Sequence, residues 1–376
     1  MRVALFTETF LPKLDGIVSI LCLALKHLHD RGHSALLIGP AGMPAEYAGA
    51  RCLGVRGPRF PLYPEVRMGL PSPRIGQALR EFQPDLVHVV NPVFLGPTGM
   101  LYARRMRLPL VASYHTDVPG YARHYGYPWA EPWIWRLFRT LHNRADLNLV
   151  PSSAVLRQVR EHGFKRVRWW WRGIDTARFR PALRDPAMRT RLSGGQPDAF
   201  LLLYAGRIAK EKGVERLREP LRQLPGVRLA LVGGGPELEQ VRALYEGTPT
   251  TFTGFLDGDD LVRAFASADA LVFPSVNETF GLVPLEAMAC GLPVIATMTG
   301  GLVDTLRPGV NALLYDPADP ATLAEQVRRL QHDPALRARL SEGALAHARG
   351  LSWQRTMDQL IGYYTLAMRA HRRWRS

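Results

Sequence analysis

Residues 270–296 read ALVFPSVNETFGLVPLEAMACGLPVIA: a short apolar run, a polar loop, a helix-length segment and a second short apolar run. Short apolar runs at Ala270–Phe273 and Val294–Ala296 are typical of fully buried strands. The segment between them is long enough to carry a crossover helix. A strand, a helix and a strand in this order predict neighbouring parallel strands that are covered on both faces.

The same alternation runs along the whole chain. The expected strands of a first series are Val3–Phe6, Ala35–Ile38, Leu86–Val90, Leu110–Ser113 and Leu147–Val150, with helix-length segments such as Ile17–Arg31 and Trp133–Ala145 between them. A second series has Leu201–Ala205, Arg228–Val232, Thr250–Thr253, Ala270–Phe273 and Val294–Ala296. We therefore predict an α/β protein with two Rossmann-like, doubly wound domains that face each other across a cleft.

The length of 376 residues also favours two domains, each with its own core. We place the first domain at residues 1–176, a linker at 177–198 and the second domain at 199–352. The linker assignment rests on the charge, proline and glycine of Arg178–Asp198, which lacks apolar periodicity. Residues 353–376 have a helical pattern and no strand after them, so we expect a C-terminal helix that packs back toward the first domain.

Composition excludes several classes of protein. Hydrophobic residues make up 47% of the chain and charged residues 22%, as in globular proteins, and no apolar run is as long as a membrane span. Cys22, Cys52 and Cys290 lie too far apart for a zinc site and predict no disulfide framework. Because Met1–Phe6 enters a strand pattern without a secretory signal, we expect a cytoplasmic protein.

The formal net charge of +15 favours anionic partners: nucleic acid, anionic lipid or phosphorylated substrates. Nucleic acid is disfavoured, because the arginines are scattered and no nucleic-acid-binding motif is present.

Ligands of open parallel sheets bind beyond the carboxyl ends of the strands. There, the loop Gly206–Gly213 carries Arg207 and Lys212, whose charges suit a diphosphate. A solvated basic turn is the alternative interpretation. Gly233–Glu237 ends the next strand with glycines that let backbone approach a ligand, although an ordinary strand-to-helix turn explains them equally well.

Pro274–Gly291 is the most specific stretch. Glu278 lies in its loop and Glu286 follows two helical turns later, so both carboxylates can face one cleft. Carboxylates accept hydrogen bonds from sugar hydroxyls, and the N–H groups of Gly281, Leu282 and Val283 suit phosphate oxygens. The alternative is a pair of acids that complement a helix dipole, which is plausible for Glu278 but not for Glu286 among apolar neighbours.

These motifs together resemble the retaining glycosyltransferases of GT-B architecture, glycosyltransferase family 4. The residues that carry the resemblance are Asp15-Gly16, Ser113-Tyr114-His115-Thr116, Arg172-Gly173-Ile174-Asp175 with Phe179 and Pro181, Gly206-Arg207 to Lys212-Gly213, Gly233–Glu237 and Glu278–Glu286. The resemblance implies an acceptor-binding first domain, a nucleotide-sugar-binding second domain, and no cofactor or metal. It also implies front-face transfer, in which the donor phosphate receives the acceptor proton and no protein nucleophile is needed.

The resemblance also assigns roles. Gly16 would approach the donor phosphates, His115 would contact the transferred sugar, and Arg207 and Lys212 would stabilise the departing diphosphate. Glu278 would hold sugar hydroxyls and Glu286 the ribose. Other implied donor contacts are Gly234, Thr279, Phe280, Gly281, Leu282 and Val283.

Asp257-Gly258-Asp259-Asp260 has the spacing that other glycosyltransferases use to bind a metal. Because a helical pattern follows at Leu261–Ala266, we interpret these acids as a helix start instead.

Within the family, the chain is most similar to sulfoquinovosyl and related diacylglycerol and phosphatidylinositol sugar transferases. This likeness rests on Ser72-Pro73-Arg74-Ile75, Ser113 to Pro119, Ala145-Asp146-Leu147 with Val150-Pro151-Ser152, and Met188-Arg189 with Arg191-Leu192-Ser193. It implies a UDP-sugar donor, with UDP-sulfoquinovose as one candidate, and a lipid acceptor. For a sulfonated sugar, Lys13 and Arg74 are the candidate cations.

Three aromatic or basic segments suit a membrane surface. They are Phe164–Arg172 with three tryptophans, the tail with Arg369, Arg372, Arg373, Trp374 and Arg375, and a cluster of Tyr121, Tyr125, Tyr127, Trp129, Trp133 and Trp135. A strand that buries alternate tryptophans is the favoured interpretation of the first segment, and ordinary core explains the third equally well. We expect a peripheral protein on the inner face of a membrane.

The sequence is compatible with other functions. A mannosyl- or glucosyltransferase that uses GDP- or UDP-sugars on phosphatidylinositol or a small polyol is the nearest alternative. A non-catalytic sugar-nucleotide-binding protein would not need Glu278, Arg207 and Lys212 together. A phosphorylase would need a lysine-bound pyridoxal cofactor, for which the sequence shows no signature.

Overall fold

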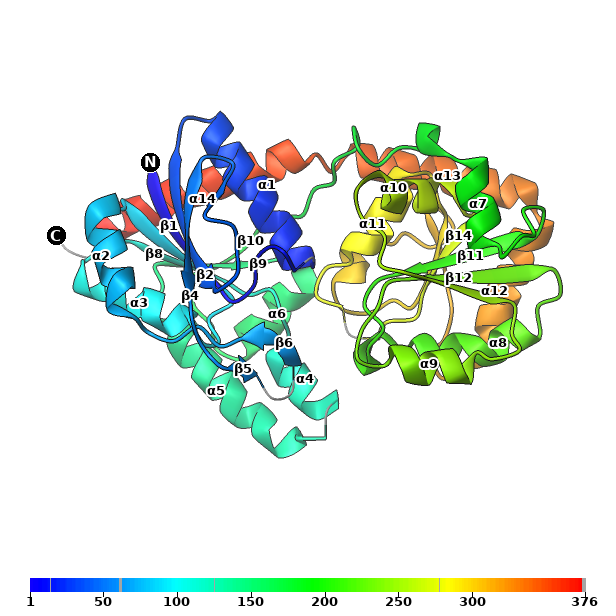
Figure 1. Cartoon of the computed structure of the whole chain (residues 1–376), viewed down its shortest axis with the longest axis horizontal. Helices are drawn as coiled ribbons and strands as arrows, with labels where there is room; N and C mark the ends of the chain where they lie inside the picture. Colours follow the sequence, from blue (N-terminus) through cyan, green and yellow to red (C-terminus); the bar gives the residue numbers. More distant parts are fainter. Residues whose placement is uncertain (14, 61–62, 125, 277, 374–376) are drawn as a thin grey trace. The chain divides into compact units, whose positions relative to one another are not determined.

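The computed structural model describes residues 1–13, 15–60, 63–124, 126–276 and 278–373. The chain divides into two compact units (Figure 1). Unit 1 comprises Met1–Trp171 and the C-terminal segment that begins at Trp353, and unit 2 is Arg172–Ser352.

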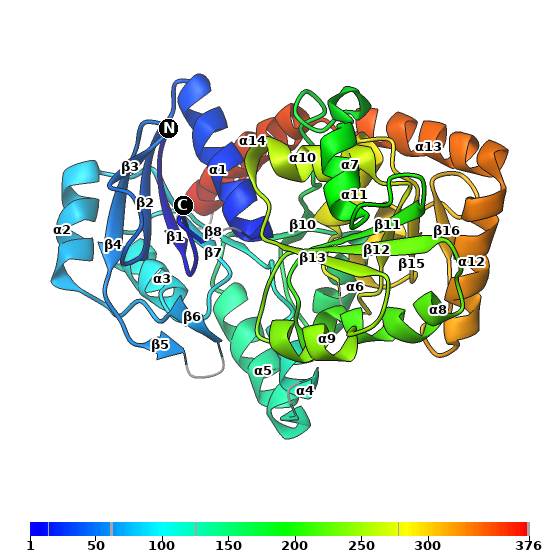
Figure 2. The ribbon, with the colours of Figure 1, turned by 45° about the vertical axis from the view of Figure 1, so that its right-hand side comes forward.

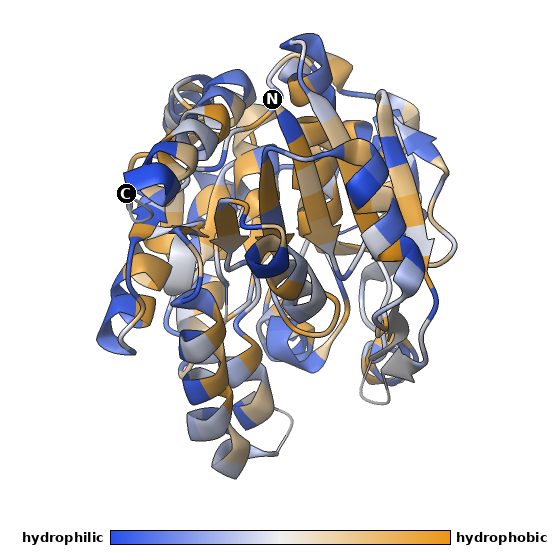
Figure 3. Cartoon of the chain, turned by 90° about the vertical axis from the view of Figure 1, so that its left-hand side faces the viewer, coloured by the Kyte–Doolittle hydropathy of each residue, from blue (hydrophilic) through white to orange (hydrophobic). Residues whose placement is uncertain are grey.

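Unit 1 is built on a mainly parallel sheet with the strand order β10-β9-β8-β7-β1-β2-β4-β3 among the described residues. The strands are β1 Arg2–Thr7, β2 Ser34–Pro40, β3 Glu46–Tyr47, β4 Ala50–Val55, β7 Leu86–Val90, β8 Leu110–Ser113, β9 Leu147–Val150 and β10 Val167–Trp169, and β5 Arg59–Phe60 pairs separately with β6 Tyr63–Arg67. Residues Val3–Phe6 are fully buried. Such continuous apolar strands are expected where helices cover both faces of a sheet, and Figure 3 shows these strands orange along most of their length.

Helices cover the two faces of this sheet. They are α1 Gly16–Asp30, α2 Pro73–Phe82, α3 Gly96–Arg105, α4 Val118–His124, η1 Pro128–Ala130, α5 Glu131–His142, α6 Ser153–Glu161 and α14 Trp353–Arg373. Ile75 of α2 and Met100 of α3 pack on the face that carries Phe6. On the other face, α14 binds α1 through Asp358, whose carboxylate lies 2.8 Å from Nε2 of His27. No helix in the described part of the chain is both long enough and apolar enough to cross a bilayer.

Unit 2 has a parallel sheet with the order β13-β12-β11-β14-β15-β16 (Figure 2). Its strands are β11 Phe200–Ala205, β12 Val227–Val232, β13 Thr250–Gly254, β14 Ala270–Phe273, β15 Val294–Ala296 and β16 Ala312–Leu314. Its helices are η2 Pro181–Leu183, α7 Pro186–Leu192, η3 Lys210–Lys212, η4 Val214–Leu217, α8 Arg218–Arg222, α9 Leu238–Leu244, α10 Gly258–Ser267, α11 Leu282–Ala289, η5 Gly300–Asp304, α12 Pro320–His332 and α13 Pro334–Arg349.

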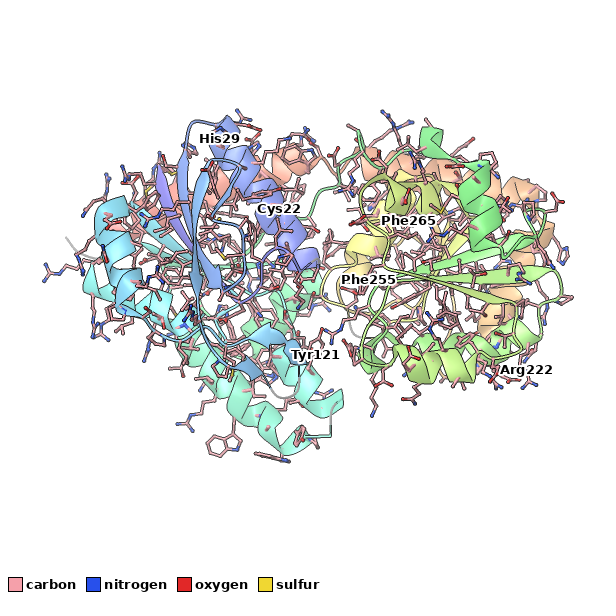
Figure 4. The ribbon with its side chains drawn as sticks, viewed as in Figure 1. Cys22, His29, Tyr121, Arg222, Phe255 and Phe265 are labelled. Carbon is pink, nitrogen blue, oxygen red and sulfur yellow. The ribbon has the colours of Figure 1, made fainter. Side chains whose placement is uncertain are left out.

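The alternation of side chains along β11 builds the two cores of unit 2. Leu201 and Leu203 join the cluster that includes Phe265 of α10, which Figure 4 labels. Leu202 and Tyr204 join the cluster on the opposite face with Val327 of α12. A strand period of two residues therefore places helices on both faces, as the doubly wound prediction requires.

Each sheet has a switch point at which neighbouring connections leave in opposite directions. In unit 1, β1 lies between β2 and β7, and in unit 2, β11 lies between β12 and β14. The loops after these strands are the expected ligand-binding positions of the fold. The predicted fold class of two Rossmann-like parallel-sheet domains is confirmed.

The linker prediction for residues 177–198 needs correction. This stretch contains η2 and α7, and Met188 and Leu192 of α7 are buried in the core of unit 2. Asp185 caps α7 by accepting hydrogen bonds from the N–H groups of Ala187 and Met188. The helix has too few apolar residues to show a period, so the sequence pattern missed it.

The chain also leaves unit 1 after Trp171, five residues before the predicted boundary at 176. Ile174 already belongs to unit 2, where its N–H donates to the carbonyl of Leu351 at 2.9 Å. The division of roles between the domains stays a prediction.

Candidate functional site

The carboxyl edge of the unit 2 sheet is built by loops that hydrogen-bond to one another. The N–H of Ile208, after β11, donates to the carbonyl of Gly234, after β12, at 2.9 Å. The N–H of Gly301, after β15, donates to the carbonyl of Glu278, after β14, at 2.8 Å. The backbone thus joins the strand ends in two pairs, β11 with β12 and β14 with β15, and these loops frame the predicted donor-binding residues.

Lys212 and Glu278 meet within this frame, one on each side of the switch point. Nζ of Lys212 lies 2.9 Å from Oε2 of Glu278, and both side chains are mostly buried. Burial by itself would raise the pKa of Glu278, but the ammonium group of Lys212 and the N–H groups of Phe280 and Gly281 hold that pKa below its usual value. Glu278 is therefore a carboxylate at neutral pH.

Helix α11 starts directly behind this pair. Gly281, at its N-cap, has φ +90°, and its N–H donates to Oε1 of Glu278 at 3.2 Å. No described side chain caps the first turn, which begins with Leu282 and Val283. Because Pro284 has no N–H, Leu282 and Val283 supply the first-turn amides that can meet an anion.

Glu286 lies on α11 and is half-buried. Burial raises the pKa of Glu286 to about 7, although the charge of Arg178 opposes the shift. Arg178, which the sequence interpretation missed, donates from Nη2 to the carbonyl of Gly258 at 3.1 Å. A carboxyl that titrates near neutrality inside a predicted ligand site is a candidate for function.

Arg207 is half-buried in the loop after β11. The hydroxyl of Tyr204 donates to its carbonyl at 2.6 Å and so fixes the backbone at this point. Its predicted role at the diphosphate stays a prediction.

In unit 1, His115 follows β8 and is half-buried. Its Nε2 lies 2.7 Å from Oγ of Ser113, and its ring contacts the indole of Trp170 edge-on at 6.1 Å between centroids. The N–H of His115 donates to Oδ1 of Asn91, after β7, at 3.4 Å. His115 is therefore held from two neighbouring strand ends.

Helix N-termini at this edge of unit 1 are occupied by the chain's own carboxylates. Oδ1 of Asp15 accepts from the N–H groups of Ile17 and Val18 at 3.0 and 2.9 Å, beside the predicted phosphate contact Gly16. Glu8, after β1, accepts from the N–H groups that precede and begin α3, which are those of Val93, Phe94, Leu95 and Gly96. The sequence interpretation missed Glu8, although the rule that useful residues follow strands points to it.

Lys13 and Arg74, the two cations predicted to bind a sulfonate, have different contacts in the structure. Nζ of Lys13 is 3.4 Å from Oδ2 of Asp15, so a carboxylate already neutralises part of its charge. Arg74 is exposed in the first turn of α2, where its N–H donates to the hydroxyl of Ser72 at 3.4 Å. Their role stays a prediction.

Comparison with known proteins decides the family. Residues 14–178 match the model of Glycosyltransferase Family 4, and residues 192–347 match that of Glycosyl transferases group 1. The chain is 39% identical over 373 residues to a GDP-mannose-dependent alpha-mannosyltransferase of Mycobacterium tuberculosis, covering 97% of this chain and 96% of that protein. The chain belongs to the family 4 glycosyltransferases.

Further relatives of this glycosyltransferase differ in donor and acceptor. It is 36% identical over 362 residues to the sulfoquinovosyl transferase SQD2 of Arabidopsis thaliana, covering 94% of this chain and 71% of that protein. It is 38% identical over 313 residues to D-inositol 3-phosphate glycosyltransferase 1 of Catenulispora acidiphila, covering 77% and 73% of the two chains. The glycosyltransferase is thus a nucleotide-sugar enzyme whose particular donor and acceptor these names leave open.

Solved structures share the fold of this glycosyltransferase. The sucrose-phosphate synthase of Thermosynechococcus elongatus superimposes with a TM-score of 0.84 at 23% identity, covering 98% of this chain and 99% of that one. HepE of Anabaena in complex with UDP-glucose gives a TM-score of 0.78 at 22% identity, covering 98% and 99% of the two chains. Both confirm the GT-B architecture.

Several glycines of the glycosyltransferase are needed for contact between loops, whereas the sequence predicted that they let the backbone approach a ligand. A Cβ on Gly233 would lie 1.9 Å from the carbonyl oxygen of Gly206, and one on Gly235 would lie 2.3 Å from that of Ile208. Close contact between two loops of unit 2 thus already requires glycine here, without any ligand. At Gly234, the predicted donor contact, a Cβ would meet the ring of Phe255 at 2.6 Å.

Phe255 is a second residue of the glycosyltransferase that the sequence interpretation missed. It follows β13 and is 76% exposed, although it is a large aromatic residue (Figure 4). An exposed ring beside the glycines of the donor loop offers a flat apolar surface to a ligand.

The Asp-x-Asp segment starts helix α10 of the glycosyltransferase. Asp257 occupies the N-cap position without a side-chain hydrogen bond to the helix, and Asp260 pairs with Arg263 at 3.0 Å. In the described parts of the chain, no group of three or more His, Cys, Asp or Glu could hold a metal ion.

The aromatic segments of the glycosyltransferase divide between core and surface. Trp170 and Trp135 are buried, whereas Trp129 and Trp133 are 71% and 68% exposed. Arg369, Arg372 and Arg373 lie in α14, while Tyr125, Trp374 and Arg375 fall outside the described residues.

Proposed function

We propose that this glycosyltransferase moves a hexosyl group, with retention, from UDP-hexose to a lipid acceptor such as diacylglycerol at an anionic membrane surface. UDP-sulfoquinovose is one candidate donor, on the similarity to SQD2. The donor would bind unit 2 and the acceptor unit 1.

The contacts of Lys212 and Glu278 are the observation that carries this proposal. They combine a cation, a carboxylate and the uncapped start of α11 at one switch point. A diphosphate needs the cation and the helix amides, and the sugar beside it needs a hydrogen-bond acceptor. In the proposed complex, Lys212 turns from Glu278 to the diphosphate, which leaves the Glu278 carboxylate to accept from sugar hydroxyls.

The transfer step then follows from these charges. The bond between the sugar C1 and the diphosphate oxygen breaks, and its electron pair stays on the diphosphate. Lys212 and Arg207 stabilise that developing negative charge. The acceptor hydroxyl forms the new bond at C1 on the same face, and its proton passes to the departing phosphate oxygen, so the products are UDP and a glycoside of retained configuration.

A GDP-mannose donor is the second candidate. It is favoured by the relative of Mycobacterium tuberculosis, which matches nearly the full length of both chains at 39% identity. The same site chemistry serves either nucleotide, because the diphosphate and the hexose are common to both.

The α4–α5 arm, residues 118–124 and 126–142, supports a membrane role. It extends from the sheet of unit 1 (Figures 1 and 3), with Tyr121 labelled on α4 in Figure 4. Trp133 and Leu137 lie one turn apart on the exposed side of α5, with exposed Arg136 between them, and exposed Trp129 precedes the helix. Glu131, the acid of this arm, already pairs with Arg123. Exposed tryptophan next to arginine suits an anionic bilayer interface.

The test incubates the purified full chain with UDP-glucose, UDP-sulfoquinovose or GDP-mannose. Each donor is combined with vesicles that contain diacylglycerol or phosphatidylinositol, or with free inositol phosphate, and products are identified by mass. A glycosylated lipid from a UDP-sugar supports the proposal. A product only from GDP-mannose, or only on inositol phosphate, replaces it with the corresponding alternative.

The proposed membrane binding is tested separately, by measuring how much protein binds to vesicles. Co-sedimentation with phosphatidylglycerol vesicles is expected to fall about tenfold for the double variant Trp129→Ser, Trp133→Ser, because both indoles leave the interface. Leu101→Ser, at an exposed apolar residue of α3, serves as the matched control. Equal vesicle binding by the double variant and the control would show that the α4–α5 arm does not bind the membrane.

A further inference from the structure

A chain of buried polar side chains leads from the C-terminal helix to His115. The hydroxyl of Tyr364, on α14, lies 2.8 Å from Nδ1 of His88. Nε2 of His88 lies 2.9 Å from Oγ of Ser113, and the same oxygen lies 2.7 Å from Nε2 of His115. Tyr364, His88 and Ser113 are all buried. These four groups come from α14, β7 and the end of β8, and all belong to unit 1.

The hydroxyl of Tyr364 determines which group donates and which accepts in each of these hydrogen bonds. Among the described residues, its hydroxyl makes a hydrogen bond to His88 alone. Burial raises the pKa of Tyr364, so the hydroxyl keeps its proton, and a buried O–H without an acceptor is costly. The hydroxyl therefore donates to Nδ1 of His88.

The remaining protons follow in order. A neutral His88 that accepts at Nδ1 carries its proton on Nε2 and donates it to Oγ of Ser113. Ser113 then donates its own hydroxyl proton to Nε2 of His115, because Ser113 is buried and His115 is the other hydrogen-bond partner of its hydroxyl among the described residues. A neutral His115 that accepts at Nε2 carries its proton on Nδ1.

We infer that Tyr364 is a positioning residue which, through His88 and Ser113, holds His115 neutral with its proton on Nδ1. An imidazolium at His115 would have to donate from Nε2 to Ser113. Either Ser113 Oγ would then accept from both imidazoles and leave its own buried proton without an acceptor, or every bond would reverse and leave the buried hydroxyl of Tyr364 without one.

The cavity beside the two histidines is lined mainly by apolar side chains. A small cavity beside both imidazoles is lined by Leu5 of β1, Ile17 and Leu21 of α1, Val90 of β7, the Trp170 indole and Leu360 of α14. Asp117, the nearest acid in sequence, accepts instead from the hydroxyl of Tyr114 and the N–H of Gly120, both at 3.1 Å. Among the residues that line this cavity, His88 is the titratable group beside His115.

The tautomer itself is independent of the proposed function, and its catalytic consequence rests on that function. Positive charge develops at the sugar C1 as the diphosphate leaves. A neutral imidazole can donate one hydrogen bond to the sugar without placing a like charge beside this carbon, whereas an imidazolium would oppose the step. The chain from Tyr364 thus selects the form of His115 that suits the reaction.

The experiment begins with the full chain labelled with ¹⁵N-histidine. Long-range ¹H–¹⁵N spectra distinguish the two neutral tautomers, and His115→Gln assigns the signals among the 11 histidines. We expect His115 with its proton on Nδ1 in the unaltered protein. We expect mixed tautomers in Tyr364→Phe, and in Ser113→Ala, which breaks the chain without changing α14.

Tyr363→Phe is the matched control. Its hydroxyl, on the same helix, donates to the carbonyl of Trp169 at 2.7 Å and takes no part in the chain. The tautomer of His115 should be unchanged in this variant. A single Nδ1–H tautomer that persists in Tyr364→Phe would overturn the inference.

Activity provides the second measurement. In Tyr364→Phe, the acidic limb of the kcat–pH profile should move up by roughly one pH unit, so that kcat at pH 6 falls about tenfold while the donor KM stays within about twofold. An unshifted profile in Tyr364→Phe, alongside an inactive His115→Ala, would contradict the positioning role. If the unaltered protein transfers no sugar, the proposed function fails, and the tautomer measurement still decides the inference.

Discussion

The two units carry the same type of sheet and the same type of switch point, but they treat the nearby helix N-termini differently. In unit 1, Asp15 accepts from the first amides of α1, and Glu8 accepts from four amides at the start of α3. In unit 2, Glu278 accepts from the N–H groups of Phe280 and Gly281 and pairs with Lys212, but among the described residues no side chain caps the first-turn amides of Leu282 and Val283. The same fold thus has one edge, the neutralised edge, whose helix ends are filled by the chain's own acids, and another, the open edge, where the first-turn amides of α11 remain available to an anion.

This difference supports the proposed division of labour. A diphosphate would be stabilised most by the free first-turn amides of α11 in unit 2. A neutral group, such as the hydroxyl of an acceptor or of the transferred sugar, suits the edge of unit 1, where His115 is itself held neutral in our inference. Substitutions in the open edge of unit 2 should therefore affect catalysis and donor binding, and substitutions in the neutralised edge of unit 1 should affect stability.

The largest effect is expected at Glu278 in the open edge. Glu278→Gln keeps the size of the side chain but removes the charge that pairs with Lys212 and accepts from the sugar. We expect kcat to fall roughly a hundred- to a thousandfold in steady-state assays, because this charge acts next to the reacting carbon. Glu239→Gln, at an 88% exposed acid of unit 2, is the control. Transfer by Glu278→Gln within about threefold of the unaltered protein would contradict the site.

The second-largest effect is expected where two loops at the same edge of unit 2 are in close contact. Gly300 and Gly258 have nearly the same positive φ, +53° and +52°, but a Cβ on Gly300 would lie 1.9 Å from the carbonyl oxygen of Glu278, whereas Gly258 has open space. We expect Gly258→Ala to lower the free energy of unfolding by about 1 kcal/mol, and Gly300→Ala by about 3 kcal/mol, with loss of activity. Denaturant unfolding measures both values. Equal losses would show that backbone strain alone, without loop contact, sets the cost.

The third effect concerns the pH dependence of donor binding. Glu286 has a pKa raised to about 7 by burial, so it is protonated below that pH and becomes a carboxylate above it. If the carboxylate accepts from the ribose, the donor KM should fall by about tenfold from pH 6 to pH 8. Glu286→Gln, which carries no titrating group, should show a flat profile. A KM that rises with pH in the unaltered protein would assign the opposite protonation state to binding.

The smallest effect is expected in the neutralised edge. Glu8→Gln keeps one acceptor oxygen for the amides of Val93–Gly96 but removes the charge, so the free energy of unfolding should fall by about 1 kcal/mol. Added sulfate should recover part of this loss in Glu8→Gln, because an anion can then occupy the helix end. Thermal unfolding with and without sulfate measures this recovery. An equal stabilisation of the unaltered protein by sulfate would show that Glu8 does not block anion binding at this helix end.

Much of the fold could be predicted from local pattern. The buried runs Val3–Phe6 and Leu201–Ala205 form central strands where the apolar pattern predicts them. Such runs are recognisable because a parallel sheet buries both faces of its inner strands. Helix α7 was missed because Met188 and Leu192 are too few to show a helical period, although the cap Asp185-Pro186 was visible.

The candidate site was predictable in part for a similar reason. Arg207, Lys212, Glu278 and Glu286 follow strands or lie on the helix after one, so the rule for open sheets points to them. Phe255 and Arg178 were missed because their significance depends on a neighbour distant in sequence, Gly234 for the first and Glu286 for the second.

The sequence by itself determined the two parallel sheets, the family, and the charged residues placed just beyond the strands, because these depend on local periodicity and on motifs of short span. Only the tertiary structure decided which helix ends are filled by the chain's own acids and which carboxyl titrates near neutrality. It alone joined Tyr364 to His115, since hydrogen bonds and burial connect residues that lie far apart along the chain.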